Sequence, residues 1–270
     1  MERVAYLGPQ GSYSELAAAK FRKDGKLIAC PSFRAAVELL KKGDCDYAAL
    51  PIENSLNGAV LANIDLLQST QGVFACEHAR VMLDHRLATL NGAKTDGISR
   101  IYSHEQPLAQ CADYLYKNFP QAQLIAAPST AASLNAVKSE SDAAIVGAHV
   151  KRDGITLSPR NIADFPHNFT EFLLVRRGSA DERAKTDKIF FSVTCRHKSG
   201  ALLDILEPMR AGGLNMTKIQ SRPIKGSSGE YRFFIEAEGD YADNSVRAVL
   251  NGIEKISLSL KLIGAYKSGD

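Results

Sequence analysis

Short apolar runs alternate with segments of helical spacing over the first two thirds of the chain. The apolar runs lie at 4–7, 47–52, 98–102, 124–127 and 143–146. Between them, apolar residues recur at helical spacing at 15–22, 33–41 and 108–118. Strands that alternate with helices favour an α/β domain with a mostly parallel sheet. We place this domain at 1–176.

The pattern changes after a charged, apolar-poor segment at 177–187, which is typical of a linker. Strands are predicted at 188–195, 215–222, 231–237 and 258–264, and helices at 200–211 and 241–256. Pro208 predicts a kink or an irregular end in the first of these helices. The β-α-β-β-α-β order predicts a ferredoxin-like α+β domain at 188–270.

Composition argues against several classes of protein. The net charge is only +3 over 270 residues, and no run of five like charges occurs, so we expect no nucleic-acid partner. No apolar stretch is long enough to cross a membrane, and the N-terminus lacks the pattern of a signal peptide. The five cysteines are widely spaced without a C-x-x-C pair, as in a reducing compartment. We therefore expect a cytoplasmic protein.

Polar residues follow several predicted strands and begin the next helix. Ser12 with Glu15 and Ser103 with Gln106 match capping boxes, and Thr130 precedes an alanine-rich segment predicted to be helical. Helix N-termini at the carboxyl edge of a sheet can hold a small anion, although most α/β proteins cap their helices in this way. Nucleotide-binding glycine motifs, a nucleophile elbow and ligand-spaced histidines are absent from the sequence, so we expect neither a cofactor nor a metal.

The segment PIENSLNG at 51–58 places three hydrogen-bonding side chains at one strand exit. It resembles the P-I-E-N-S-x-x-G motif of prephenate dehydratases. Other motifs of that family occur in order: YLGPQGSYS at 6–14, SHEQPLAQC at 103–111, STAA at 129–132, AAI at 143–145 and NFTEF at 168–172. The resemblance covers nearly the whole chain, and the ordered set is far more specific than any single motif.

The resemblance implies a catalytic domain like a type II periplasmic binding protein. One lobe would comprise about 1–79 plus 161–176, and the other about 80–160. The cleft between the lobes would hold prephenate, which loses carbon dioxide and hydroxide to give phenylpyruvate. Aromatisation drives this reaction, so it needs no metal or redox cofactor.

Several site residues follow from the same motifs. Thr170 would lie at the leaving hydroxyl as a hydrogen-bond donor. Further catalytic residues are expected at Glu53, Asn54 and Ser55, and substrate contacts at Ser12, Ser103, Gln106, Thr130 and Phe172. His85 and His104 are expected to be packed or surface histidines without a catalytic role.

The second domain resembles an ACT regulatory domain. The segment GAL at 200–202 matches a motif that the family uses for phenylalanine, and QSRP at 220–223 resembles the E-S-R-P motif. The resemblance implies a phenylalanine site formed by Gly200, Ala201, Leu202, Asn215, Ser221 and Arg222. It also implies feedback inhibition by phenylalanine and a homodimer or homotetramer.

One position departs from the family pattern, because the arginine of N-x-T-R-F is Glu171 here. Three interpretations are open. Side chains alternate along a strand, so Glu171 can point away from the site and leave prephenate as the substrate. Alternatively, Glu171 pairs with the ammonium of arogenate, or the dehydratase activity is weakened, as in prephenate decarboxylases. A non-catalytic binding protein that senses an amino acid is the alternative of another class, and turnover of prephenate distinguishes it.

Overall fold

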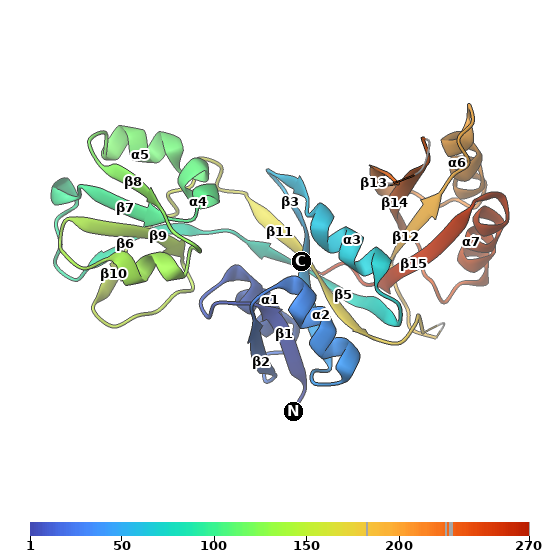
Figure 1. The fold of residues 1–270 in the computed structure, drawn as a ribbon, viewed down its shortest axis with the longest axis horizontal. Helices are drawn as coiled ribbons and strands as arrows, with labels where there is room; N and C mark the ends of the chain where they lie inside the picture. Colours follow the sequence, from blue (N-terminus) through green and yellow to red (C-terminus); the bar gives the residue numbers. More distant parts are fainter. Residues whose placement is uncertain (182, 225, 227–228, 270) are drawn as a thin grey trace.

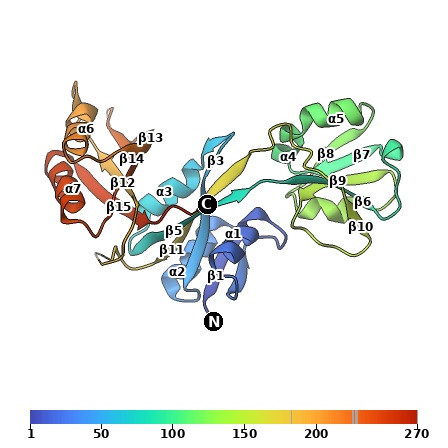
Figure 2. The same cartoon turned by 180° about the vertical axis from the view of Figure 1, so that it is seen from behind.

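The computed structural model describes residues 1–181, 183–224, 226 and 229–269, and contains a ten-stranded and a five-stranded β-sheet. Three units follow one another along the longest axis (Figure 1): a green unit with the smaller sheet, a central unit mainly in blue and cyan, and an orange to red unit. The view from behind in Figure 2 shows the same order, so the central unit separates the other two.

The central unit is built on one part of the larger sheet. Its strands are β1 (Arg3–Leu7), β2 (Lys26–Cys30), β3 (Tyr47–Asn54), β4 (Gly58–Ala59), β5 (Val73–Met82) and β11 (Phe169–Arg177). Its helices are α1 (Tyr13–Phe21), α2 (Phe33–Lys42) and α3 (Leu61–Ser69). β1 is parallel to β2 and β3, whereas β11 lies between β3 and β5 and is antiparallel to both. The sheet is therefore mixed, not mostly parallel as predicted, because the chain leaves through β5 and returns through β11.

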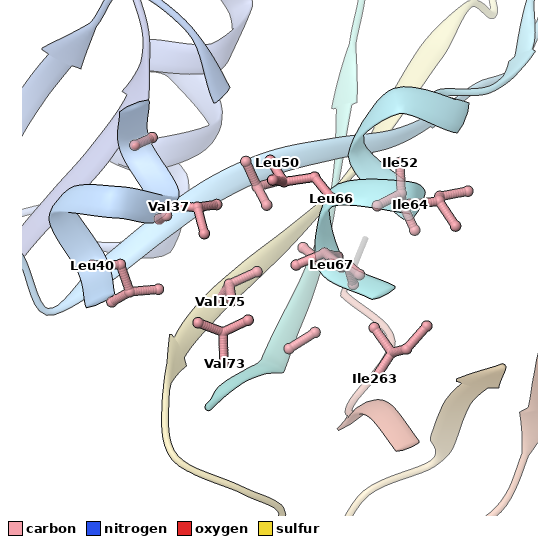
Figure 3. Close-up of a cluster of buried hydrophobic side chains, with 14 of the residues drawn as sticks. Val37, Leu40, Leu50, Ile52, Ile64, Leu66, Leu67, Val73, Val175 and Ile263 are labelled. Carbon is pink, nitrogen blue, oxygen red and sulfur yellow. The ribbon is translucent and has the colours of Figure 1, made fainter. Parts of the chain in front are cut away.

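Both faces of β3 and β11 are buried. Leu50 and Leu173 face a core cluster formed with α2 and α3, whereas Ala49 and Leu174 face the cluster beneath α1. Figure 3 shows the first cluster, which also contains Ile263 from the C-terminal unit. Burial on two faces explains why 47–52 is a continuous apolar run and not an alternating one.

The smaller sheet lies in the unit drawn in green. Its strands are β6 (His85–Leu90), β7 (Arg100–Ser103), β8 (Gln123–Ala126), β9 (Asp142–Gly147) and β10 (Ile155–Leu157), and its helical segments are η1 (Thr95–Gly97), α4 (Glu105–Gln110), α5 (Ala112–Asn118) and η2 (Ala132–Ala136). β9 is antiparallel to β6 and parallel to β7, so this sheet is also mixed. The alanine-rich segment, which the sequence predicted to be helical, forms a short 3-10 helix, η2.

The C-terminal unit has the β-α-β-β-α-β order that its sequence predicted. Its elements are β12 (Lys188–Thr194), α6 (Ala201–Ala211), β13 (Met216–Pro223), β14 (Tyr231–Glu238), α7 (Asn244–Ile256) and β15 (Ser259–Tyr266). The strands pair antiparallel in the order β13-β14-β12-β15. α6 continues for three residues beyond Pro208, although proline removes one helical N–H donor.

The C-terminal unit joins the central unit through a continuous sheet. β15 pairs in parallel with β5 at Gly264 and Ala75. A Cβ atom at Gly264 would lie 2.7 Å from the Cβ of Ala75, so glycine permits the close approach of the two strands. Among the described residues, no helix is long and apolar enough to cross a membrane.

Candidate active site

The end of β3 and the start of β11 bring Asn54 and Thr170 together as cross-strand partners. The Asn54 Nδ2 group donates to Thr170 Oγ1 at 3.1 Å, to Asn168 Oδ1 at 2.9 Å and to the Phe169 carbonyl at 3.1 Å. The Asn54 side chain is therefore fixed, and the residue is only 5% exposed. Because Thr170 Oγ1 accepts this bond, its own hydrogen is available to a ligand oxygen.

Ser55 and Asn168 hold the loop that precedes Thr170. The Ser55 hydroxyl donates to Asn168 Oδ1 at 3.0 Å and accepts from the Phe169 backbone N–H at 3.0 Å. Asn168 is 1% exposed, and its Nδ2 atom has no partner among the described residues. The structure thus gives Ser55 a positioning contact. It also adds Asn168, which sequence reasoning left out of the site although it begins the N-x-T motif.

Glu53 and Glu171 form the neighbouring cross-strand pair, and their carboxylates meet Lys218 of β13. Lys218 Nζ lies 3.0 Å from Glu171 Oε2 and forms an ion pair with Glu53 Oε2. On its other side, Glu171 Oε1 accepts from Arg80 Nε at 3.1 Å. The Glu171 carboxylate is therefore engaged by cations of the protein, while the Thr170 side chain contacts Asn54.

Burial raises the pKa of the Glu171 carboxyl, but His78 and Lys218 lower it by more, so the pKa lies well below its ordinary value. Burial lowers the pKa of the Lys218 ammonium, but Glu171 and Glu53 raise it by more, so the pKa lies above its ordinary value. Both groups are charged at neutral pH, and neither is poised to exchange a proton with a substrate.

Ser12 acts as a helix cap. Its hydroxyl accepts from the Glu15 backbone N–H at 3.2 Å and donates to the Leu7 carbonyl at 3.1 Å. The Glu15 carboxylate reaches back to the Gly11 backbone N–H at 2.6 Å. The Ser12 half of the predicted capping box is therefore formed, whereas Glu15 accepts from the residue before the cap, because the Ser12 backbone N–H donates to the Pro9 carbonyl. These contacts occupy the hydroxyl that was predicted to bind substrate.

Two predicted substrate residues are buried by packing. Ser103 is fully buried at the end of β7, and its hydroxyl donates to the Ile145 carbonyl at 2.9 Å. The cap of α4 is His104, not Ser103 as predicted, because Ser103 is still part of the strand. Phe172 is 2% exposed and packs with Ala17 and Val81 under α1. Both placements argue against direct contact with a substrate.

Gln106 and Thr130 keep their side chains free. Gln106 is exposed and Thr130 is half-buried, and neither side chain is hydrogen-bonded to a described residue. They remain available for a ligand. However, within the described part of the chain no hydrogen bond joins Ser103, Gln106 or Thr130 to the Asn54 and Thr170 pair.

Contacts near α1 join the central unit to the unit with the smaller sheet. The Tyr13 hydroxyl donates to the Asp84 carbonyl at 3.0 Å, and its ring meets the edges of His85 and His149. Burial lowers the pKa of His85 and of His149, which favours their neutral forms. His85 is 1% exposed, in agreement with the prediction of a packed histidine, whereas His104 is exposed.

A cavity of about 570 Å³ also opens between these two units. It is lined by Gln10 and Gly11 on one side, and by Ala132, His149 and Arg152 on the other. The described residues hold no group of three or more His, Cys, Asp or Glu side chains that could bind a metal ion.

The C-terminal unit has a smaller cavity of about 280 Å³ at the start of α6. Three residues predicted to bind phenylalanine, Gly200, Ala201 and Leu202, line it. The other three lie elsewhere: Asn215 donates to Glu238, Ser221 is exposed on β13, and Arg222 forms an ion pair with Asp65 of α3.

Comparisons with known proteins agree with this architecture. The family model described as prephenate dehydratase matches residues 4–180. The chain is 34% identical over 269 residues to the bifunctional chorismate mutase/prephenate dehydratase of Neisseria gonorrhoeae, covering 97% of this chain and 74% of that protein. It is 31% identical over 275 residues to the prephenate dehydratase of Amycolatopsis methanolica, covering 100% and 90% of the two chains. The crystal structure of prephenate dehydratase from Arthrobacter aurescens in complex with L-Phe superposes with a TM-score of 0.90 at 31% identity, covering 99% and 90%.

Proposed function

Because this chain belongs to the prephenate dehydratase family, we propose that it converts prephenate to phenylpyruvate at the hydroxyl of Thr170. The observation that carries this assignment is the hydrogen bond from Asn54 Nδ2 to Thr170 Oγ1. It directs the hydroxyl hydrogen of Thr170 away from Asn54 and towards the leaving hydroxyl of the substrate.

The reaction requires a hydrogen-bond donor at the leaving hydroxyl of the substrate. The bond from the ring to the carboxylate breaks, carbon dioxide leaves, and its electron pair enters the ring. As that pair moves through the ring and makes it aromatic, the bond from the ring to the hydroxyl breaks, and the departing hydroxide takes a proton from solvent and leaves as water. A threonine hydroxyl stabilises the charge that develops on this oxygen, and a fixed donor of this kind is worth about 10²–10³ in rate.

The geometry supports prephenate over arogenate as the substrate. A choice of arogenate would require Glu171 to present its carboxylate to the substrate ammonium. Instead, Arg80 and Lys218 neutralise that carboxylate. This arrangement also supports retained dehydratase activity over the decarboxylase alternative, because the Asn54 and Thr170 pair is intact beside the exchanged residue.

We also propose that the C-terminal unit is an ACT-type regulatory domain that binds phenylalanine and inhibits the enzyme. The cavity at Gly200, Ala201 and Leu202 supports this site, and the Arthrobacter aurescens relative was solved with L-Phe. In a homodimer or homotetramer, Asn215, Ser221 and Arg222 would reach the effector from a second copy of the chain. In that case Arg222 exchanges its partner Asp65 for the effector.

The remaining predictions complete the proposal. The two lobes of the catalytic domain, divided near 80 and 160, would close on the substrate as in type II periplasmic binding proteins, with the linker at 177–187 before the regulatory domain. Residue 182 of this linker lies outside the described residues. A cytoplasmic location, the absence of a cofactor and the absence of a nucleic-acid partner stay predictions.

The test is a parallel assay of purified protein with prephenate and with arogenate. Formation of phenylpyruvate from prephenate, detected by its absorbance in alkali, is the expected result. Arogenate should give little phenylalanine. Turnover of arogenate alone would reject the assignment of the substrate, and turnover of neither compound would reject the enzyme and favour a binding protein.

A further inference from the structure

The Lys218 ammonium links three strands from two units of the fold. Lys218 lies on β13 of the C-terminal unit, whereas its partners Glu53 and Glu171 lie on β3 and β11 of the central unit. All three side chains are largely buried, with exposed fractions of 18% for Lys218, 30% for Glu53 and 12% for Glu171. Screening by water is therefore weaker here than at an exposed ion pair.

The Lys218 ammonium offsets the repulsion between the two glutamates. Glu53 and Glu171 are directly opposite on antiparallel strands, where like charges destabilise the pairing. Arg80 offsets the charge of Glu171 alone. Among the described residues, Lys218 is the ion-pair partner of Glu53. Without Lys218, the two carboxylates would face each other with Arg80 and the His78 ring beside Glu171 alone, and among the described residues Glu53 would lose its ion-pair partner.

The carboxylates are adjacent to the proposed reaction centre. Glu53 precedes Asn54, and Glu171 follows Thr170. The register between the two strands shifts directly after this point: Glu171 pairs with Glu53, and Phe172 pairs with Pro51. Such a bulge loosens the ladder and re-aims side chains. The position of Thr170 therefore depends on the glutamate pair as well as on the backbone.

We propose that Lys218 is a positioning residue for the dehydratase reaction: it holds Glu53 and Glu171 together and so keeps the Asn54 amide in contact with the Thr170 hydroxyl. This inference rests on the proposed function, which places Thr170 and Asn54 at the reaction centre. It means that the C-terminal unit supplies a side chain on which catalysis depends even when no effector is bound.

Other contacts keep the C-terminal unit in place without Lys218. Lys261 of β15 donates to the Leu67, Gln68 and Thr70 carbonyls at the end of α3, at 2.7 to 2.8 Å. Asp65 of α3 pairs with the same strand that carries Lys218. A change at Lys218 therefore removes the cation between the glutamates and leaves the units joined.

The first test is the variant Lys218→Met, which keeps the length of the side chain and removes its charge. We expect kcat for prephenate to fall about tenfold or more at about pH 8, because small misplacements of catalytic groups have effects of this size. The KM should change by less than about twofold, since Lys218 does not contact the substrate. Lys218→Arg should retain most of the activity. The matched control is Asp65→Asn, which removes the other ion pair between β13 and the central unit and should leave kcat unchanged.

The pH profile supplies a readout that a purely structural role would not move. In Lys218→Met, one carboxylate of the pair should take up a proton as the pH falls from about 8 to about 5.5, so the repulsion ends and kcat should recover relative to wild type. The charged and titratable groups that face this pair are His78 and Arg80 of β5, Glu236 of β14 and Tyr266 of β15. The wild type, which retains its ammonium, should show no such gain.

A second variant keeps the inference testable if Lys218→Met is poorly folded. The double variant Lys218→Met with Glu171→Gln removes the cation together with one of the two opposed charges. Its kcat should return to within about threefold of wild type. A normal kcat in Lys218→Met, or a loss that neither acid nor the double variant relieves, would overturn the role of Lys218. Failure of the wild type to convert prephenate would instead refute the proposed function itself.

Discussion

Replacing Asn54 by aspartate would reverse the hydrogen bond to Thr170 while conserving the size of the side chain. In the native protein, Asn54 Nδ2 donates to Thr170 Oγ1. A carboxylate in its place can only accept, so the Thr170 hydroxyl would turn its hydrogen towards residue 54 and away from the leaving group. The turn after β3 should survive, because the Leu56 and Asn57 backbone N–H groups still find an acceptor oxygen.

The magnitude follows from the contacts that are lost. The substrate loses one fixed donor at the developing charge, which corresponds to about 10²–10³ in kcat, or about 3–4 kcal/mol in the barrier. Asn168 Oδ1 and the Phe169 carbonyl also lose the amide donor, but Ser55 continues to donate to Asn168. A buried carboxylate would also face these two acceptor oxygens, so the free energy of unfolding should fall by about 3 kcal/mol or more.

The assay is steady-state formation of phenylpyruvate by Asn54→Asp at about pH 8, with urea unfolding of the same preparation. Asn57→Asp is the matched control, because this side chain is exposed in the same turn, and its kcat should stay within about twofold of wild type. If Asn54→Asp keeps more than about a third of the wild-type kcat while folded, the direction of this hydrogen bond is irrelevant to catalysis, and the reasoning is refuted.

Three further outcomes are expected. Glu171→Arg should lower the free energy of unfolding by about 3 kcal/mol or more in denaturant titrations, because it places a third cation beside Arg80 and Lys218. The folded variant should gain no activity with arogenate. Gly200→Val should abolish phenylalanine binding in calorimetry, because Gly200 lines the cavity at the start of α6 and has a φ of +77°, which valine rarely adopts. The control variant Gly252→Ala on α7 should bind phenylalanine normally. Burial lowers the pKa of His85 below its ordinary 6.5, so the unfolded chain binds this proton more readily than the folded protein. The stability that the neutral His85 ring contributes is therefore complete above about pH 6.5 and is lost as the pH falls below it. The melting temperature should drop between about pH 7 and pH 5.5, and it should drop less in His85→Gln.

The sequence predicted the strands whose apolar pattern follows directly from burial. The runs at 47–52 and 143–146 are continuous because β3 and β9 are buried on both faces. β5 was missed because Glu77, His78 and Arg80 interrupt its apolar pattern. Those polar residues serve contacts that only the fold creates, such as the bond from Arg80 to Glu171. The antiparallel pairing of β11 with β3 and β5 likewise depends on how the chain returns to the central unit, which local periodicity does not encode.

The candidate site likewise contains residues that the motifs predicted and residues that only the fold brings there. The motifs predicted Asn54, Ser55 and Thr170, and the structure brings these three residues together. They did not predict that Ser103 and Phe172 are buried, since burial depends on neighbouring strands and helices. Nor did they indicate Lys218, which lies 47 residues from Glu171 in the sequence and meets it only because the C-terminal and central units join in one sheet at β15 and β5.

The most direct test of the central claim is the turnover of prephenate by Thr170→Val, which conserves shape and removes only the hydroxyl. Thr156→Val, which removes an exposed hydroxyl bonded to Asn91, is the control and should keep full activity. We expect Thr170→Val to bind prephenate within about threefold of the wild-type affinity and to lose about 10²–10³ in kcat. A folded Thr170→Val protein with kcat within about threefold of wild type would contradict the placement of Thr170 at the leaving hydroxyl.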